Sequence, residues 1–379
     1  MDTSPSPVVM QVLPALNAGG VERGTVEIAA AIVQAGGTAL VASAGGRLAP
    51  WVERAGGRNI ILPLASKSPW RIWRNAAALT RVAAAKRVDL IHARSRAPAW
   101  SAWLAARRAG VPFVTTYHGA YNENFPGKRR YNAIMAAGDR VIAISHFIAD
   151  LIKVRHAIDP ARIRVIHRGV DPAIFDPDVV VPDRIVRLLT AWRLPDGVPT
   201  IMLPGRITRW KGPQVLIRAL AQMQRRDAMV VLVGDAQGRE GFVAELVALA
   251  AELGVAERVR LVGHCEDMPA ALMLSDVVVN ASTDPEAFGR VVIEAQAMAR
   301  PVVGSDHGGA VETIEHGETG WRVPPDDPAA LAAALDHALD MDAEQRAALG
   351  ARARASVRAN YTVAAMQSKT LDVYEELLR

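Results

Sequence analysis

Two carboxylates stand eight residues apart in the segment 284–294, DPEAFGRVVIE. Glu286 precedes a predicted helix and Glu294 lies roughly two turns into it, so both side chains can face the same cleft. A carboxylate accepts hydrogen bonds from the vicinal hydroxyls of a ribose or hexose. The backbone amides near Phe288 and Gly289, at the helix start, suit a sugar hydroxyl or a phosphate. A capping carboxylate followed by a solvated helix glutamate would give the same pattern.

Two cations, Arg206 and Lys211, share a predicted loop between a strand at 201–203 and a helix that begins with Pro213. Ligands of open α/β sheets bind beside such loops, at the carboxyl edge of the sheet. A guanidinium grips an anion with a fixed geometry and an ammonium acts as a point charge, so together they suit a diphosphate. Two solvated loop cations are the alternative interpretation.

Glycines and a histidine follow strands of the first half. Gly19 and Gly20 come after the first predicted strand and open a helix, where the backbone can approach a ligand and the helix N-terminus favours an anion. They do not form the dinucleotide pattern G-x-G-x-x-G, and a tight strand-to-helix turn explains them equally well. His118 ends another strand and precedes a glycine, a position compatible with a structural or a functional histidine.

The elements that must position these residues are short β-branched runs, bounded by Gly, Pro or Asp, which alternate with longer Ala/Leu-rich segments. The alternation predicts βαβ units and parallel sheets covered on both faces. It stops at residues 171–199, which carry five prolines and one plausible helix and which we interpret as the interdomain connection. The predicted strands are 8–13, 38–41, 60–62, 90–92, 113–116, 141–144 and 164–166, then 201–203, 229–233, 259–262, 277–280 and 301–304.

The length of 379 residues then predicts an α/β chain of two doubly wound Rossmann-like domains that face a cleft. We expect an N-terminal domain over 1–178, a C-terminal domain over 179–355, and a C-terminal helix over 356–379 that packs back on the first domain. The single cysteine, Cys265, excludes an intrachain disulfide and a multi-cysteine metal site. The sequence has no run of 18 apolar residues and no basic leader at its N-terminus, so we expect a cytoplasmic protein.

Charge is distributed unevenly along the chain. Residues 1–180 hold 23 Lys and Arg against 12 Asp and Glu, a net charge of +11, and the remainder carries −6, which gives +5 in all. A basic half favours an anionic partner, such as nucleic acid, a phosphate-rich membrane surface or an acidic acceptor. A solvated surface with an arginine bias accounts for the same numbers.

Taken in order, these features resemble the retaining glycosyltransferases of family 4, which have the two-domain GT-B fold. The resemblance covers nearly the whole chain and is most specific over 276–325. Within that family, the segments 19–25, 92–96 and 115–119 are most similar to lipopolysaccharide-core glycosyltransferases. One departure is the segment 166–171, IHRGVD, where many relatives have Pro-Asn-Gly-Val-Asp. It adds Arg168 as a further cation near the interdomain cleft.

For the positions that match the family pattern, the resemblance implies roles in binding a nucleotide sugar. Arg206 and Lys211 would bind the diphosphate and stabilise the departing nucleoside diphosphate. Glu286, with the amides of Phe288 and Gly289, would hold the hexose. The remaining positions would complete the site, with Glu294 on the ribose, His118 beside the sugar, Gly19, Gly20 and Gly234 close to the nucleotide sugar, and 263–268 against the base.

The resemblance further implies transfer of a hexose, with retention, from a UDP-, GDP- or ADP-sugar to a hydroxyl of lipopolysaccharide core or a related glycolipid. It implies no resident cofactor and no metal. Asp176 and Asp178 look superficially like a metal-binding D-x-D, but they lie in the Pro-rich segment, where turn chemistry explains them. The implied partners are the nucleotide sugar, an acidic glycolipid and the anionic inner-membrane surface, to which the protein would bind peripherally, and no nucleic acid.

Tryptophans interleaved with cations support a membrane partner. The segment 67–74, KSPWRIWR, places Trp70 and Trp73 three residues apart among basic side chains. Tryptophan and arginine together suit a headgroup interface. Packing of these helices on the sheet is the alternative interpretation of the tryptophans. The further candidates for this surface are Trp100, Trp103 and the loop 127–131.

Three other functions remain open on the sequence. A nucleotide-sugar epimerase of the same fold would need additional acid and base carboxylates, which do not occur at matching positions. A nicotinamide oxidoreductase would need the G-x-G-x-x-G turn that is missing here. A nucleic-acid-binding protein would use the basic half, but its arginines are scattered over βαβ units without a known motif.

Overall fold

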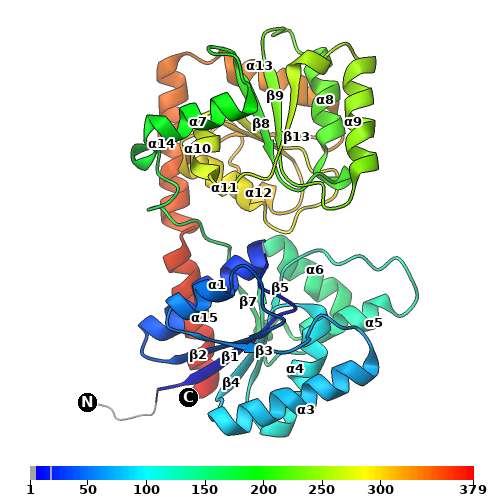
Figure 1. Cartoon of the computed structure of the whole chain (residues 1–379), viewed down its shortest axis with the longest axis vertical. Helices are drawn as coiled ribbons and strands as arrows, with labels where there is room; N and C mark the ends of the chain where they lie inside the picture. The colour runs from blue at the N-terminus through cyan, green and yellow to red at the C-terminus, as the bar shows by residue number, and fades with distance from the viewer. Residues whose placement is uncertain (1–5, 18) are drawn as a thin grey trace. The chain divides into compact units, whose positions relative to one another are not determined.

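The structure is a computed structural model that describes residues 6–17 and 19–379. Residues 1–5, from which we inferred that a leader is absent, and Ala18 of the predicted glycine turn lie outside the described residues. The chain divides into two compact units (Figure 1). Unit 1 consists of Met1–Arg168 and Val363–Arg379, and unit 2 consists of Gly169–Thr362.

Unit 1 is a parallel sheet with the strand order β3-β2-β1-β4-β5-β6-β7. The strands in the middle of the sheet are buried, as a sheet covered on both faces requires. The strands are β1 Val8–Val12, β2 Thr38–Ser43, β3 Arg58–Ile61, β4 Leu90–Ala93, β5 Phe113–Tyr117, β6 Arg140–Ala143 and β7 Ile163–Val165. The chain reverses its direction of winding between β1 and β4, and the loops at such a reversal form a natural ligand site.

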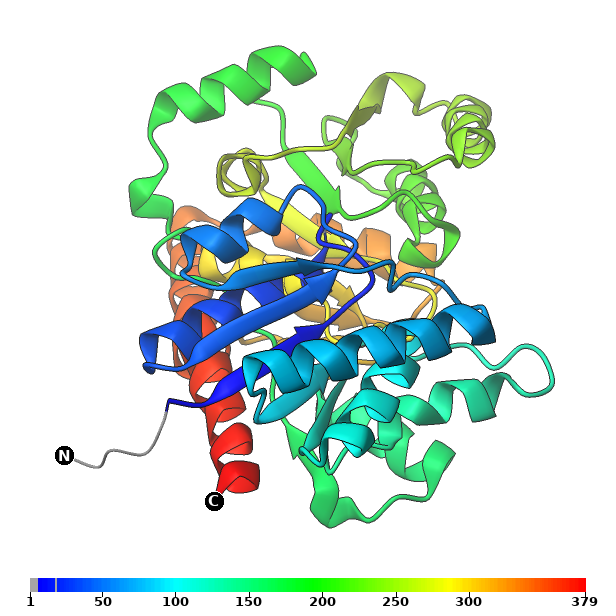
Figure 2. The same ribbon diagram turned by 60° about the horizontal axis from the view of Figure 1, so that its bottom comes forward.

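Helices cover both faces of this sheet. Figures 1 and 2 show α1 and α15 on one side of it and α3 and α4 on the other. The helices are α1 Gly20–Gln34, α2 Ala49–Arg54, α3 Pro69–Lys86, α4 Arg96–Ala109, α5 Lys128–Asn132, α6 His146–His156 and α15 Val363–Leu378. Short 3-10 helices lie at Ala133–Ala136 and Pro160–Arg162.

Unit 2 repeats this design with the strand order β10-β9-β8-β11-β12-β13, and its winding reverses between β8 and β11. The strands are β8 Thr200–Pro204, β9 Met229–Val233, β10 Val259–Gly263, β11 Val277–Asn280, β12 Val302–Ser305 and β13 Trp321–Val323. The helices are α7 Pro182–Trp192, α8 Pro213–Gln222, α9 Glu240–Glu252, α10 Met268–Met273, α11 Arg290–Ala297, α12 Ala310–Thr313, α13 Pro328–Asp340 and α14 Ala343–Asn360. Its 3-10 helices are Pro177–Val179, Arg209–Lys211 and Ala256–Arg258.

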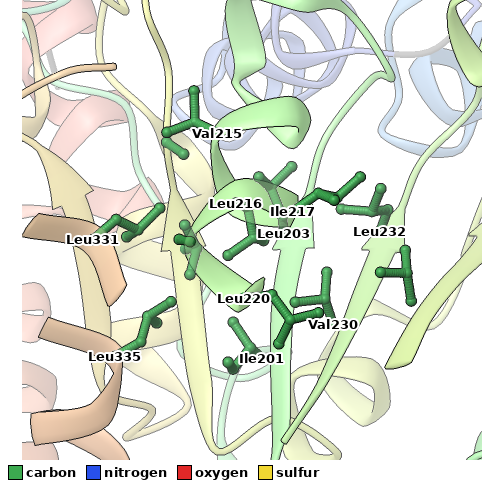
Figure 3. Packing of buried hydrophobic residues seen from close by; sticks show 14 of the residues in the cluster. Ile201, Leu203, Val215, Leu216, Ile217, Leu220, Val230, Leu232, Leu331 and Leu335 are labelled. Carbon is green, nitrogen blue, oxygen red and sulfur yellow. The ribbon is translucent and has the colours of Figure 1, made fainter. Parts of the chain in front are cut away.

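The core of unit 2 lies between its sheet and the helices α8 and α13 (Figure 3). Leu203 and Leu232 of the strands meet Leu216 and Leu220 of α8, and Leu335 of α13 closes the cluster. Each of these five leucines is at most 1% exposed. Burial of one such side chain stabilises the fold by about 1.5–3 kcal/mol, so this core holds the ends of β8 and β11 in place.

The predicted fold class, two doubly wound Rossmann-like α/β domains, is confirmed, but the domain boundaries differ from the expected positions. The Pro-rich segment 171–199 is part of unit 2 and is not a connection between domains. Val170 N–H donates to Tyr361 O over 2.9 Å, and Asp176 is paired with Arg354 of α14. These contacts attach the segment to unit 2, so the first boundary falls after Arg168, before the expected 178.

The C-terminal boundary also moves, from 355 to Thr362. Instead of one helix over 356–379, α14 ends at Asn360 and α15 begins at Val363. α15 packs against α1 in unit 1, where Gln367 Nε2 donates to Glu27 O over 2.7 Å. No helix in the described part of the chain is long and apolar enough to cross a bilayer.

Candidate active site

The loops that follow β8 and β11 meet at the winding reversal of unit 2. Thr283 N–H donates to Trp210 O over 2.8 Å and joins the two loops. Gly212, with φ of 72°, precedes α8, and a Cβ there would lie 1.9 Å from Ala281 O. Only glycine permits both that conformation and that close approach, so Gly212 in the predicted loop before Pro213 serves to bring the two loops together.

The joined loops place Lys211 against Glu286. Lys211 Nζ lies 2.5 Å from Glu286 Oε1, and the two side chains are only 13% and 17% exposed. The Ser282 hydroxyl lies 3.1 Å from the second carboxylate oxygen and 2.7 Å from Asn280 Oδ1. Lys211 Nζ also lies 4.7 Å from the ring centre of Trp210, a cation–π contact. The pair is therefore held on every side by named groups.

The protonation of Glu286 follows from these contacts. Burial alone raises the pKa of a carboxyl, but the charge of Lys211 and hydrogen bonds from Lys211, Ser282 and Asn280 outweigh it and hold the pKa of Glu286 below its ordinary value. The side chain is thus ionised at neutral pH. An ionised carboxylate accepts hydrogen bonds from sugar hydroxyls and cannot serve as a general acid.

A glycine turn supports the loop that carries Glu286. Gly309 N–H donates to Glu286 O over 2.7 Å, and His307 Nε2 lies 2.8 Å from Ser282 O. Sequence reasoning missed Asn280, Ser282 and His307 as parts of this site. The available signal was the Gly308–Gly309 pair, which lies within the segment 276–325 that most resembles the family.

Phe288 and Gly289 place the start of α11 beside this loop. The Phe288 ring is buried and packs edge-on against Tyr361, with ring centres 5.7 Å apart. Gly289 adopts a left-handed φ of 78° and directly precedes the helix. The side chain of Phe288 thus anchors the backbone whose amides form the N-terminus of α11, where a helix favours an anion.

Glu294 lies in a different environment from the one expected. α11 begins at Arg290, so Glu294 is about one turn into the helix and not two, because the three residues after Glu286 form a loop. Its buried carboxylate lies 3.4 Å from Arg290 Nε. The arginine compensates the charge of the carboxylate.

Arg206 and Gly234 lie at the ends of β8 and β9. The Arg206 side chain is exposed to solvent. A Cβ at Gly234 would lie 1.8 Å from Gly205 O, and Ile207 N–H donates to Asp235 O over 3.1 Å. Gly234 therefore packs the β9 loop against the loop that carries Arg206, which is a positioning role in addition to the predicted approach to a nucleotide sugar.

The segment 263–268, expected to contact the base, follows β10. Its Asp267 is 2.6 Å from Arg184 of α7 and accepts from Ala270 N–H at the start of α10. These hydrogen bonds, that from Arg184 foremost, hold the pKa of Asp267 below its ordinary range. Asp267 is thus engaged within unit 2.

The candidates of the first half lie in unit 1. Gly19 and Gly20 are exposed at the start of α1, with Gly19 at φ 137°. His118 directly follows β5, and its Nδ1 lies 2.9 Å from Arg168 Nη2. The structure thus places three predicted residues at the carboxyl edge of the unit 1 sheet, and it adds Arg168, which we noted in the sequence without a partner.

Comparisons with known proteins decide the family. The model of "Glycosyltransferase Family 4" matches residues 18–174 and that of "Glycosyl transferases group 1" matches 189–356. A D-inositol 3-phosphate glycosyltransferase of Xylanimonas cellulosilytica is 35% identical over 315 residues, which are 76% of this chain and 72% of the relative. The chain belongs to the family 4, group 1 glycosyltransferases. The D-inositol 3-phosphate glycosyltransferase of Salinispora tropica is 34% identical, and the alignment spans 65% of that protein and 78% of this chain.

Solved structures of this glycosyltransferase family share the fold. A glycosyltransferase of Rickettsia africae is 36% identical, with a TM-score of 0.91 and coverage of 99% of this chain and 100% of that one. HepE of Anabaena, solved in complex with UDP-glucose, is 25% identical, with a TM-score of 0.85 and coverage of 98% and 100%. The predicted GT-B fold is therefore confirmed. The narrower resemblance to lipopolysaccharide-core enzymes is not supported by these relatives. WaaG, a glycosyltransferase of lipopolysaccharide biosynthesis, is 18% identical and shares the fold alone.

Proposed function

We propose that this protein is a metal-independent, retaining glycosyltransferase that moves a hexose from a nucleotide sugar to a hydroxyl of an acidic glycolipid. The observation that supports it best is the Lys211–Glu286 pair beside the N-terminus of α11. It sets a cation, an ionised carboxylate and a helix start at one sheet edge, which are the groups that a sugar attached to a diphosphate requires. The complex of the Anabaena relative with UDP-glucose supports a nucleotide sugar as substrate.

In this proposal the acceptor hydroxyl attacks the anomeric carbon from the face that the diphosphate leaves. The new C–O bond forms as the bond to the phosphate oxygen breaks, and the hydroxyl proton passes to that oxygen. Lys211, Arg206 and the amides of α11 stabilise the charge that develops on the diphosphate. Glu286 accepts hydrogen bonds from the sugar hydroxyls, and His118 lies beside the sugar.

The acceptor is inferred from the surface of unit 1. Trp70 and Trp73 on α3 are 63% and 52% exposed, and their rings stack with centres 5.6 Å apart. This exposure supports the membrane interpretation at Trp70 and Trp73, whereas Trp100 and Trp103 are half-buried, as the alternative interpretation expects. Lys128 lies 4.5 Å from the ring centre of Phe125, another exposed aromatic residue. Exposed aromatic rings among cations suit an anionic headgroup layer, where a glycolipid acceptor would lie and where the protein would bind peripherally on the cytoplasmic side.

A second candidate acceptor is a soluble phosphorylated cyclitol. It is favoured by the printed name of the relatives at 34% and 35% identity, D-inositol 3-phosphate glycosyltransferase. The basic excess in residues 1–180 accommodates the phosphate of either acceptor.

One experiment tests the function and separates the acceptors. The protein is incubated with UDP-, GDP- and ADP-hexoses, each with a phosphorylated lipopolysaccharide-core acceptor or with inositol 3-phosphate, and nucleotide release and the product anomer are measured. We expect an α-linked product from an α-linked nucleotide sugar, and only with the glycolipid. A product from inositol 3-phosphate alone would establish the second candidate. No transfer from any of the nucleotide sugars, or an inverted product, would refute the proposed reaction.

A further inference from the structure

The pairing of His118 with Arg168 has a chemical consequence beyond the placement of a histidine. Arg168 Nη2 lies 2.9 Å from His118 Nδ1, and the arginine is 5% exposed. A guanidinium carries only donors and stays protonated at any ordinary pH. The hydrogen bond therefore runs from Arg168 to Nδ1, so Nδ1 holds a lone pair and the proton of the neutral ring is on Nε2.

The groups around the ring also disfavour a second proton. Burial, then the charges of Arg168 and Arg94 and the neighbouring His92, hold the pKa of His118 well below its ordinary value. His92 is itself kept neutral, since burial and Arg94 lower its pKa. Tyr121, whose hydroxyl lies 3.4 Å from the His118 backbone nitrogen, has a pKa raised by burial, and it carries no charge either. The ring thus faces cations and neutral groups.

Helix α1 supplies the space for this arrangement. A Cβ at Gly24 would lie 2.2 Å from Arg168 Nη1 and 3.0 Å from Arg94 Nη2, so both guanidinium groups pack against the backbone of α1 at a glycine. Arg94 is held in turn by Gln11 Oε1 over 3.1 Å, and Gln11 Nε2 donates to Thr25 O over 3.0 Å. Arg168 therefore packs against α1 beside a second guanidinium, Arg94, that hydrogen bonds hold in place.

His118 Nε2 is buried, and it has no hydrogen-bond partner among the residues that the structure describes. We propose that Arg168 is a positioning residue that holds His118 as the neutral Nε2–H tautomer, so that the ring presents a fixed N–H donor to an oxygen of the substrate and does not act as a base. The substrate in question is the nucleotide sugar of the proposed function, on which this inference rests. A sugar hydroxyl or a phosphate oxygen would accept this hydrogen bond.

Nitrogen NMR of ¹⁵N-histidine-labelled protein tests the tautomer without substrate. The signals of His118 are identified by their loss in His118→Asn. In the wild-type protein we expect an unprotonated Nδ1 and a protonated Nε2 that do not titrate between pH 5.5 and 8. In Arg168→Met we expect averaged tautomers and a pKa that returns toward about 6.5. Arg168→Lys keeps a cationic donor and should retain the wild-type signals in part.

Kinetics link the tautomer to the reaction. In Arg168→Met, kcat should fall on the acid side, below about pH 6.5, while kcat of the wild-type protein stays flat there. Arg164→Met is the matched control. Arg164 lies within β7, a few residues before Arg168, and it pairs with Glu376 at the surface. A wild-type His118 that titrates near 6.5 or is protonated on Nδ1 would overturn the inference, and so would an unchanged pH profile in Arg168→Met. The NMR result stands apart from the proposed function, because a locked tautomer in a protein without transfer activity would refute only the latter.

Discussion

Lys211 Nζ and Glu286 Oε1 lie 2.5 Å apart, although 75 residues separate them in the chain. The contact joins the loops after β8 and β11, and each charge compensates the other in a site that is mostly shielded from water. A substitution at either position therefore changes the charge of its partner's surroundings as well as its own. The first two predictions depend on this coupling.

Loss of either loop cation should slow the reaction. We expect Lys211→Ala and Arg206→Ala each to lower kcat by about 10²–10³-fold, the usual effect of removing one group that stabilises developing charge. Steady-state nucleotide release measures this. Arg209→Ala is the matched control, because Arg209 lies in the same loop but pairs with the exposed Glu245. Turnover like that of the wild-type protein in both variants would refute the diphosphate role.

The paired charges should also be coupled in stability. Lys211→Met leaves the ionised Glu286 without its cation, at a cost of about 1–3 kcal/mol in the free energy of unfolding. The double variant Lys211→Met, Glu286→Gln should recover part of that loss, because no unpaired charge remains. Urea unfolding of the four proteins gives the coupling energy. Strictly additive effects would show that the two side chains do not interact in solution.

Activity should not depend on a divalent metal. The groups proposed to neutralise the diphosphate are Lys211, Arg206 and the start of α11, and Glu286 is already engaged with Lys211. We expect the rate in excess EDTA to equal the rate in Mg²⁺ or Mn²⁺ within about twofold, a difference of roughly 0.4 kcal/mol in the barrier. Activity that EDTA abolishes and Mn²⁺ restores would contradict this prediction.

The exposed aromatic and basic surface of unit 1 should bind anionic membranes. We expect co-sedimentation with vesicles that contain an acidic phospholipid and little binding to neutral vesicles, since each cation near the surface contributes about 1 kcal/mol. Charge reversal of Arg71, Arg74, Lys128, Arg129 and Arg130 should abolish the binding. Ser replacements at Trp70 and Trp73 should weaken it without unfolding α3, because both rings are exposed.

The matched control for this surface reverses basic residues of unit 2. Arg226 and Arg239 are exposed on loops of unit 2 and are not among the basic residues of the proposed membrane surface. Their reversal should leave vesicle binding unchanged. Equal binding to neutral and anionic vesicles, or binding that survives reversal of the five unit 1 cations, would contradict the membrane prediction.

The stability of unit 1 should depend on pH through Glu376. Hydrogen bonds from Arg140, then from Arg164, lower the pKa of Glu376 to about 2 from its ordinary 4.5. Because the folded-state pKa is depressed, the stabilisation is present in full above about pH 4.5 and disappears as the pH falls through 2. Since the side chain is about one-third exposed, the network contributes about 1 kcal/mol.

The measurement is urea unfolding of Glu376→Gln and the wild-type protein at pH 7, 4 and 3. We expect the difference in midpoint to be largest at pH 7 and to shrink toward pH 3. Glu375→Gln is the control, because Glu375 is paired with the exposed Arg379 and not with Arg140 or Arg164 in the described residues. A difference that grows on acidification would show that another group is responsible.

The regular elements could be predicted from the sequence because their signals are local. Buried parallel strands consist of β-branched runs, and every predicted strand is present. The strand Trp321–Val323 was missed, since it has three half-buried residues and no flanking apolar run. The break between α14 and α15 was missed because Tyr361 and Thr362 are not helix breakers. The Pro-rich segment was misassigned because its attachment depends on an ion pair between Asp176 and the distant Arg354.

Those site residues could be predicted whose role follows from their type and their position in the chain. Residues whose role depends on a contact in the tertiary fold could not. The chemistry of Lys211 and Glu286 could be inferred from charge and position at strand ends. Ser282 and His307 act through hydrogen bonds that form only in the tertiary fold, and no periodicity marks such residues. Arg168 was visible as an extra cation, but its contact with His118 spans 50 residues and joins the segments after β5 and β7, which β6 separates in the sheet.

The return of α15 to unit 1 sets the order in which the chain can fold on the ribosome. His92 Nδ1 lies 2.6 Å from the hydroxyl of Tyr374, 282 residues later in the chain. At about 5–20 residues per second, that partner is synthesised tens of seconds after β4. Unit 2 is one continuous segment, so all of it emerges before the first sheet receives its last helix. Until then, the core residues that contact Met366 and Val373 stay uncovered, and chaperones that bind apolar surface have their longest access to the nascent chain at this sheet.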